Sequence, residues 1–191
     1  RVAAAALQLG ISKENVVAFT KTMINFGEVT QEALGASSKQ LVRFGELFHV
    51  PQTELDRLAS TLVKLGFGLR TSSSEVLDMA SKLGSMGKAA GMSVQQVLGF
   101  SGGLASVGIE AGRGGMAIGN MIADMSRAVA GGNEMLGLFA ATAGMTSEKF
   151  SIAFKQNAMG ALLAFFEGIN QLQKRGGDVF GKRAQRLLRA A

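Results

Sequence analysis

One three-residue pattern occurs three times along the chain and limits what it can fold into. A glycine is followed by Ile or Met and then by a hydroxyl residue, at Gly10-Ile11-Ser12, Gly91-Met92-Ser93 and Gly144-Met145-Thr146. Glycine readily ends a helix in a left-handed conformation, and Ser or Thr is favoured as the N-cap of the next helix. The pattern therefore predicts three helix-turn-helix junctions. Because the intervals between them are unequal, we interpret it as a repeated turn and not as a solenoid period.

Further helix starts follow from polar residues placed before apolar runs. In each of the three junctions the middle residue is apolar and faces an apolar N4 residue, which is the spacing of a hydrophobic staple. Ser93 is followed three residues later by Gln96, which predicts a capping box. The other predicted starts are Thr30, the segment Thr53-Glu54-Leu55-Asp56 after Pro51, the residues Ser72 to Ser74, and Asn133.

Apolar residues recur at helical rather than alternating spacing, and no segment predicts a pair of strands. We therefore predict an all-α fold, with short to medium helices joined by capped turns in a glycine- and alanine-rich bundle or array. The clearest example is one continuous apolar stripe, made of Phe150, Phe154, Ala158, Ala161, Leu162, Phe165, Ile169 and Leu172.

The predicted helices contain many glycines, for example Gly102-Gly103, Gly114-Gly115 and Gly131-Gly132. Each glycine inside a helix costs roughly 0.5–1 kcal/mol relative to alanine. Two explanations stay open. Either the small residues let helices approach closely, or the chain has to unfold, thread or change shape easily.

Residues that could perform chemistry are few. The chain has no cysteine, which excludes disulfides, thiolate metal sites and cysteine nucleophiles. Its one histidine, His49, stands at a predicted helix end before Pro51, where we expect a surface or C-capping role. No metalloprotease, EF-hand, Walker or serine-elbow motif is present. We predict that the protein is not an enzyme, with no catalytic residues, no cofactor and no metal.

Two patterns have a simpler interpretation beside a functional one. The segment Gly112-Arg113-Gly114-Gly115-Met116-Ala117 loosely fits a dinucleotide-binding motif, which has meaning only after a strand; we expect a flexible loop that leads into a helix. Methionines can fill a core or form an adaptable binding groove, and both interpretations stay open. They are Met79, Met86, Met92, Met116, Met121, Met125, Met135, Met145 and Met159.

The formal net charge is +6, and basic residues gather near the C-terminal end. Such a cluster is either a solvated helix face or a contact for nucleic acid or another surface. The absence of Trp and Tyr leaves only Phe for stacking on bases. The candidate contact residues are Lys174, Arg175, Lys182, Arg183, Arg186 and Arg189.

Two segments are apolar enough to raise the question of a membrane. The uncharged stretch Ala89 to Ile109 is about as long as a spanning helix. Ser93 predicts a helix start inside it, so we do not expect a stable transmembrane helix there. For Gln156 to Gln173 a buried helix is the better interpretation, since polar residues divide its faces.

The stretch from Ser73 to Ile122 resembles the core region of bacteriophage tail tape measure proteins. The ordered series of small and apolar residues carries the resemblance, which extends more weakly back to Ala3 and forward to Lys174. The matching positions are Glu75-Val76, Ala80, Leu83-Gly84, Ala90-Gly91-Met92-Ser93, Leu104-Ala105, Val107-Gly108, Glu110-Ala111-Gly112 and Ala117-Ile118.

The resemblance implies a virion protein, made in the host cytoplasm, that occupies the lumen of the phage tail, sets tail length during assembly and takes part in genome ejection. It implies as partners the tail tube protein, tail tip or baseplate hub proteins and tail assembly chaperones, and a homo-oligomer in the lumen. The alternatives are a membrane-active helical module that enters the host envelope during DNA delivery, and a module that contacts DNA. We interpret the sequence as an excerpt of a longer chain.

Three segments organise the sequence in this interpretation. Residues 1–70 form an N-terminal helical segment, residues 71–145 the glycine-rich tape-measure core helices, and residues 146–191 an amphipathic helix followed by a basic C-terminal helix.

Overall fold

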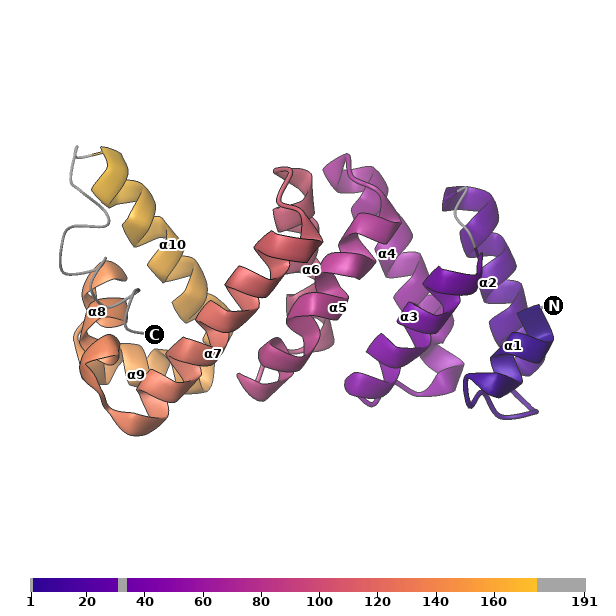
Figure 1. Ribbon diagram of the computed structural model, residues 1–191, viewed down its shortest axis with the longest axis horizontal. Helices are drawn as coiled ribbons and strands as arrows, with labels where there is room; N and C mark the ends of the chain where they lie inside the picture. Colours follow the sequence, from indigo (N-terminus) through magenta and orange to yellow (C-terminus); the bar gives the residue numbers. More distant parts are fainter. Residues whose placement is uncertain (1, 31–33, 175–191) are drawn as a thin grey trace. The chain divides into compact units, whose positions relative to one another are not determined.

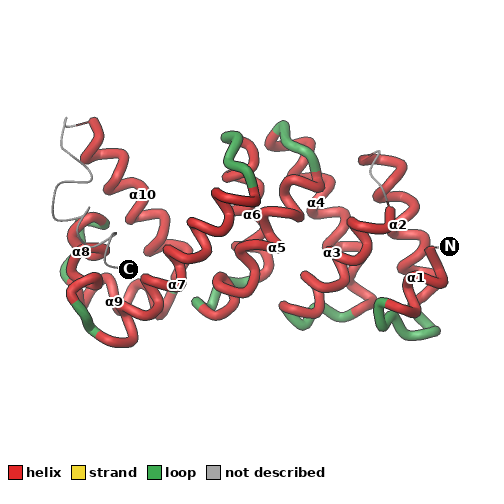
Figure 2. The backbone as a smooth tube through the Cα atoms, in the orientation of Figure 1, coloured by secondary structure: helices red, strands yellow, loops and turns green. Residues whose placement is uncertain are grey.

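The structure is a computed structural model that describes residues 2–30 and 34–174. Within these ranges the chain forms α-helices, one 3₁₀ turn and one π-helical turn, and no strand (Figures 1 and 2), which confirms the all-α prediction. The α-helices are α1 (Val2–Gln8), α2 (Val16–Thr30), α3 (Leu34–Leu47), α4 (Leu55–Leu69), α5 (Ser73–Ala89), α6 (Val94–Ser106), α7 (Met116–Gly131), α8 (Glu134–Thr142), α9 (Ser147–Gln156) and α10 (Ala158–Lys174). The 3₁₀ turn is η1 (Gln52–Glu54) and the π-helical turn is η2 (Ala111–Gly115).

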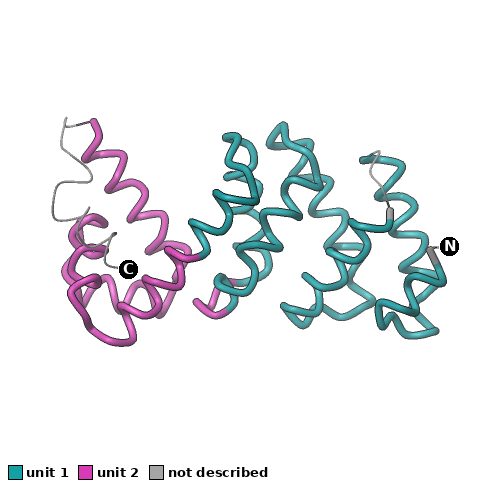
Figure 3. The backbone as a smooth tube through the Cα atoms, viewed as in Figure 1, with its two compact units in different colours: residues 1–88, 93–119 teal, residues 89–92, 120–191 magenta. Residues whose placement is uncertain are grey.

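The chain divides into two compact units, coloured separately in Figure 3. Unit 1 contains residues 1–88 and 93–119, and unit 2 contains residues 89–92 and 120–191. The three segments that the sequence predicts are divided by their expected roles as well as by their helices. That division stays a prediction.

Unit 1 is built from successive helices that alternate between two rows. In one row α4 packs against α2 on one side and α6 on the other, and in the second row α1 contacts α3. Consecutive helices also pack together as hairpins, notably α1 with α2 and α3 with α4. The core of the unit is mainly aliphatic, and its fully buried residues include Met23, Leu41, Leu62, Leu77, Met79 and Leu83.

Glycine allows two of the closest helix contacts in unit 1. A Cβ added at Gly102 of α6 would lie 2.8 Å from Leu69 Cδ1 of α4, and one added at Gly84 of α5 would lie 2.8 Å from Leu47 Cδ2 of α3. Both distances are shorter than real Cβ contacts. Close helix approach, the first of the two explanations for the glycine content, is therefore confirmed at these positions. Gly103, by contrast, has no such neighbour within 4 Å.

Unit 2 has an aromatic core in which α8, α9 and α10 pack on one another. The ring centroids of Phe139 and Phe165 are 5.6 Å apart at an interplanar angle of 73°, and those of Phe150 and Phe154 are 6.1 Å apart. Phe150 is fully buried. In the same core, a Cβ at Gly168 of α10 would overlap the backbone carbonyl of Thr142 at the end of α8.

The predicted junctions form, with one correction. Gly10, Gly91 and Gly144 all have positive φ, at 80°, 82° and 69°. Ser93 makes the predicted capping box with Gln96, and Thr146 accepts a hydrogen bond from the N–H of Lys149.

Ser12, in contrast, does not cap the next helix with its hydroxyl. Its Oγ accepts a hydrogen bond of 2.9 Å from the side-chain amide of Asn15. A turn at residues 13–15 precedes α2, which begins at Val16. The predicted start at Ser12 was therefore too early.

Three further expectations were wrong for identifiable reasons. Thr30 lies within α2 and donates its hydroxyl to the carbonyl of Phe26 at 2.7 Å, so it belongs to that helix and does not cap the next one. The apolar stripe from Phe150 to Leu172 lies on two helices, because Asn157 (φ −152°) interrupts it and accepts a hydrogen bond from the N–H of Gly160. The expected loop at Gly112–Gly115 is instead the π-helical turn η2, in which the N–H of Gly115 donates to the carbonyl of Glu110 at 3.3 Å.

Some of these methionines lie in the core and others do not. Met79 and Met125 are fully buried and Met159 is nearly so, whereas Met86 and Met116 are exposed. Core filling is therefore confirmed for the first three of these residues.

Candidate functional site

The basic C-terminal cluster can be placed only at its first residue. Lys174 is the last residue of α10, and its side chain is exposed. Arg175, Lys182, Arg183, Arg186 and Arg189 lie outside the described residues, so the nucleic-acid or surface contact stays a prediction.

His49 has the C-capping position that the sequence predicted. It follows α3 with a φ of 56°, and the N–H of Val50 donates to the carbonyl of Gly45 at 2.8 Å, which closes the helix end. Lys88 of α5 reaches the same end: its Nζ donates to the carbonyl of Leu47 and lies 3.0 Å from His49 Nε2. A cation at a helix C-terminus complements the helix dipole. This arrangement joins α3 to α5 and has a structural role.

Glu75 forms the most developed polar network in the described part of the chain. The N–H of Ser72 donates to Glu75 Oε2 at 2.9 Å, and the N–H of Glu75 donates to Ser72 Oγ at 3.1 Å, which is a reciprocal capping box at the start of α5. The hydroxyl of Thr71 adds a third hydrogen bond at 2.7 Å. The backbone N–H of Ser72, followed by the hydroxyls of Thr71 and Ser72, lowers the pKa of Glu75. All these hydrogen bonds stabilise the N-terminus of α5, and the network holds no nucleophile or base in position for catalysis.

The glycine-rich segment does not form a phosphate cradle. Helix α6, not a strand, precedes it. A hollow of about 320 Å³ beside it is lined by Gly112 and by the carboxylates Glu75, Asp78 and Glu110. Negative charge there would repel a pyrophosphate. Among the residues that the structure describes, no group of three or more His, Cys, Asp or Glu side chains could hold a metal ion.

Open grooves of unit 1 are the surface features that the sequence did not reveal. One groove, between α2 and α4, has a volume of about 410 Å³ and is here called the α2/α4 groove. It is lined by Thr22, Asn25, Phe26 and Val29 of α2 and by Asp56, Ala59, Ser60, Val63 and Lys64 of α4. A second, more apolar hollow of about 300 Å³ is lined by Ala3 of α1 and by Val16, Val17, Thr20, Lys21 and Ile24 of α2.

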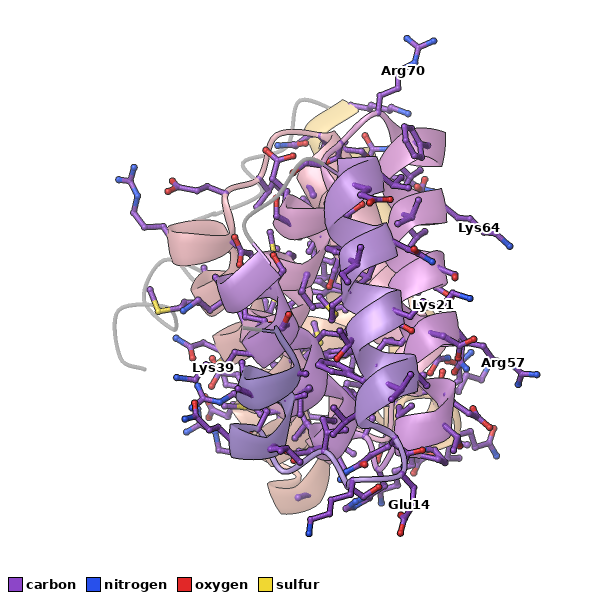
Figure 4. All side chains as sticks on the ribbon, turned by 90° about the vertical axis from the view of Figure 1, so that its right-hand side faces the viewer. Glu14, Lys21, Lys39, Arg57, Lys64 and Arg70 are labelled. Carbon is purple, nitrogen blue, oxygen red and sulfur yellow. The ribbon has the colours of Figure 1, made fainter. Side chains whose placement is uncertain are left out.

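Cations surround this part of unit 1. Figure 4 shows Arg57, Lys64 and Arg70 pointing outward from α4 and its C-terminal end, with Lys21 on α2 in front. None of these four residues forms an ion pair within the described part of the chain. The sequence of α4 holds one signal for the α2/α4 groove. Asp56, Ser60, Val63 and Phe67 recur at i, i+4, i+7 and i+11, so a helical wheel places them on one face of α4.

Every helix in the described residues falls short of the length or the apolar character that crossing a membrane requires. Ser93 caps α6 inside the uncharged stretch, as predicted.

Helices that carry open grooves and outward-facing cations are typical of structural and interaction proteins. The comparison with protein families agrees with this class: residues 1–189 match the family of phage-related minor tail proteins, and the chain belongs to that family. It is therefore a structural protein of the phage tail and is associated with the virion. No curated protein and no solved structure matched the chain.

Proposed function

We propose that the chain acts as part of a tape measure: it lies in the lumen of the tail tube and contributes to the length to which the tube polymerises. Family membership over residues 1–189 is the observation that carries this proposal. The resemblance of Glu75 to Ile122 to the tape-measure core adds to it. A helical chain can act as a ruler because each residue adds a rise of about 1.5 Å.

The fold of unit 1 gives the proposal a physical form. Its helices are short and joined by turns, so pairs of helices can be removed or added without breaking a long continuous helix. A ruler built in this way would change length in steps of one hairpin. The same construction suits a protein that leaves through the tail tip during genome ejection, since short helices can unfold one after another.

In-frame deletion of the consecutive helices α5 and α6, residues 73–109, tests the ruler. Electron microscopy should show uniformly shorter tails, by about 55 Å if the deleted segment lies in the tail as helix extended end to end along the tail axis. Duplication of the same segment should lengthen the tails by a similar amount. The matched control is Ser93→Ala, which removes the cap of α6 and leaves the number of residues unchanged. Tails of normal length from both the deletion and the duplication would contradict the proposal.

The expected partners belong to the same proposal. They are the tail tube protein, tail tip or baseplate hub proteins, tail assembly chaperones and further copies of the chain in the lumen. The proposal also includes DNA contact by the C-terminal basic cluster, which is tested separately. Salt-dependent DNA binding that Arg183→Glu and Arg186→Glu abolish would support the DNA contact.

A membrane-active role is the second candidate, favoured by the exposed apolar side chains of unit 2. Ile152 and Leu163 are 56% and 53% exposed. Deeper insertion of α10 would require Phe165 and Leu162 to leave the aromatic core. Leakage of anionic lipid vesicles on addition of the chain, reduced by Ile152→Ser with Leu163→Ser, would support this role; intact vesicles would exclude it.

A further inference from the structure

The junction between α6 and η2 has no side-chain cap. Ser93, Asn133 and Thr146 cap α6, α8 and α9 with their side-chain oxygens. Glu110, in the N-cap position of η2, makes no side-chain cap hydrogen bond. Residues 107–110, which separate the two elements in Figure 2, also contain no proline. The residue types of this junction are therefore compatible with a helix that continues through it.

The hydrogen bonds that end α6 use the same atoms as a continuous helix would. The N–H of Gly108 donates to the carbonyl of Ala105 at 2.9 Å, and the N–H of Ile109 donates to the carbonyl of Leu104 at 3.1 Å. In a continuous helix each N–H bonds to the carbonyl four residues back, so these two donors would only exchange acceptors. The N–H groups of residues 110–113 would gain the acceptors that the start of a helix lacks. Joining the helices therefore loses neither of these hydrogen bonds and adds others.

The backbone of Gly108 ends α6. Its φ is 79°, in the left-handed region, and no atom lies within 4 Å of the position that a Cβ would take. Glycine adopts left- and right-handed conformations about equally, so Gly108 has little preference for the broken junction. Any residue with a Cβ would be strained at this φ.

The helical phase of the sequence continues across the junction. Apolar and small residues recur at alternating intervals of four and three, which places them on one side of a continuous helix. They are Val97, Ser101, Leu104, Gly108, Ala111, Gly115, Ile118, Ile122, Met125 and Val129. The charged residues of the same segment share another side, because Glu110, Arg113, Asp124 and Arg127 are spaced by three, eleven and three residues.

The break between α9 and α10 is a useful contrast, because the apolar stripe continues in phase there too. In that break the side chain of Asn157 accepts a hydrogen bond of 3.0 Å from the N–H of Gly160 and so caps α10. Sequence phase alone therefore does not make a junction able to straighten. The α6–η2 junction combines phase with the lack of a cap.

A close contact with α5 favours the broken junction. A Cβ added at Gly115 of η2 would lie 3.1 Å from Met79 Sδ, so this turn packs tightly on α5. Charge acts against this packing, because Glu110 lines the same hollow as Glu75 and Asp78, and their carboxylates repel one another. The broken and the continuous arrangement are therefore in competition.

We propose that residues 107–110 are a hinge with two states. In one state the chain breaks between α6 and η2, as the structure shows. In the other state Gly108 becomes right-handed and residues 94–131 form one helix about 57 Å long. The π-helical turn then disappears, since the N–H of Gly115 bonds to the carbonyl of Ala111 and no longer to that of Glu110. Straightening lengthens the segment without unfolding it, and it does not depend on the tape-measure proposal.

The distance between two spin labels tests the hinge. The chain has no cysteine, so Gln95→Cys with Ala117→Cys gives a single pair of labelling sites, both exposed and both in unit 1. In the continuous helix these positions are about 33 Å apart along the axis, and the broken junction brings them closer because the chain turns there (Figure 1). Double electron–electron resonance measures the two populations.

Gly108→Ala in the labelled chain should raise the ratio of the long to the short distance at least about tenfold. Alanine is strained at the φ of the broken junction and is favoured over glycine inside a helix, so both effects act in the same direction. Adding Ala111→Pro to this variant should restore the short distance. Proline suits the first position of a helix, which residue 111 has in η2, but not the interior of a continuous helix.

The matched control is Gly91→Ala in the same labelled chain. Gly91 has a similar φ of 82° and equally open surroundings, but Ser93 caps the helix that follows it. This substitution should lower the melting temperature and leave the label distance unchanged.

Three results would overturn the proposal. The first is a Gly108→Ala chain with only the short distance, and the second is a long distance that persists after Ala111→Pro is added. The third is a Gly108→Ala chain that loses as much stability as the Gly91→Ala chain in thermal unfolding followed by circular dichroism, because a continuous helix offers alanine an unstrained conformation. All three concern the isolated chain and are independent of tail length.

Discussion

The two units solve the problem of packing short helices in different ways. Unit 1 brings helices together at glycines, where Gly102 meets Leu69 and Gly84 meets Leu47, around an aliphatic core. Unit 2 fills the space between its helices with rings, among them Phe139, Phe150, Phe154 and Phe165. Glycine contacts depend on the distance between two backbones, whereas a ring cluster depends on buried volume. Removing a buried ring should therefore destabilise unit 2 most, whereas adding a methyl group at a contact glycine should destabilise unit 1.

The largest effect is expected in the ring core of unit 2. Phe150→Ala should destabilise this unit by about 4 kcal/mol, because it removes a fully buried ring and leaves a cavity. The measurement is hydrogen exchange in peptides from α8, α9 and α10, in which protection should fall. Ile152→Ala on the same helix is the control, and its 56% exposed side chain should cost little. Equal losses in the two variants would show that the rings do not form the stabilising core.

Adding a methyl group should have opposite effects on stability at two adjacent glycines of unit 1. Gly102→Ala should cost up to about 1 kcal/mol, because its Cβ would come within 2.8 Å of Leu69 Cδ1 and the end of the Leu69 side chain would have to shift.

Gly103→Ala is the matched partner, with no neighbour within 4 Å, and should stabilise α6 by about 0.5–1 kcal/mol. Urea denaturation followed by circular dichroism measures both variants. If both substitutions were stabilising, α4 and α6 would not depend on glycine for their approach.

The smallest effect concerns the capping box at the start of α5 in unit 1. Hydrogen bonds from Ser72 and Thr71 hold the folded-state pKa of Glu75 below its ordinary value of 4.5. The stabilisation is therefore fully present above that value and is lost as the pH falls through the lower, folded-state pKa. Because Glu75 is exposed, we expect Glu75→Gln to cost less than about 0.5 kcal/mol at pH 7 and nothing at low pH. A cost that grew as the pH fell would reverse the sign and contradict this account.

Local contacts explain which parts of the fold could be predicted. The capping box of Ser93 and Gln96 and the cap at Asn133 depend on atoms within three residues of one another, so the sequence pattern was enough. Thr30 was misassigned because a hydroxyl can cap the next helix or bond to the carbonyl four residues back, and the sequence pattern does not distinguish these. Asn157 was missed because the apolar stripe continues in phase across the break between α9 and α10.

The candidate surfaces were less predictable than the fold. The sequence placed His49 at a helix end, and the structure confirms its C-capping conformation. It did not reveal the α2/α4 groove, because Phe26 and Ala59 are far apart in the chain and meet only when α2 packs beside α4.

The sequence by itself determined that the chain is all-α, where α5, α6, α8 and α9 begin, and that its ordered small residues resemble a phage tail protein. These features depend on short-range backbone preferences and on the order of residues. The tertiary structure alone decided which glycines are close contacts, how the apolar stripe is divided, and that a groove forms between α2 and α4 with an exposed Phe67 near its end. Such features depend on distances between helices that are remote in sequence, and helical periodicity does not encode those distances.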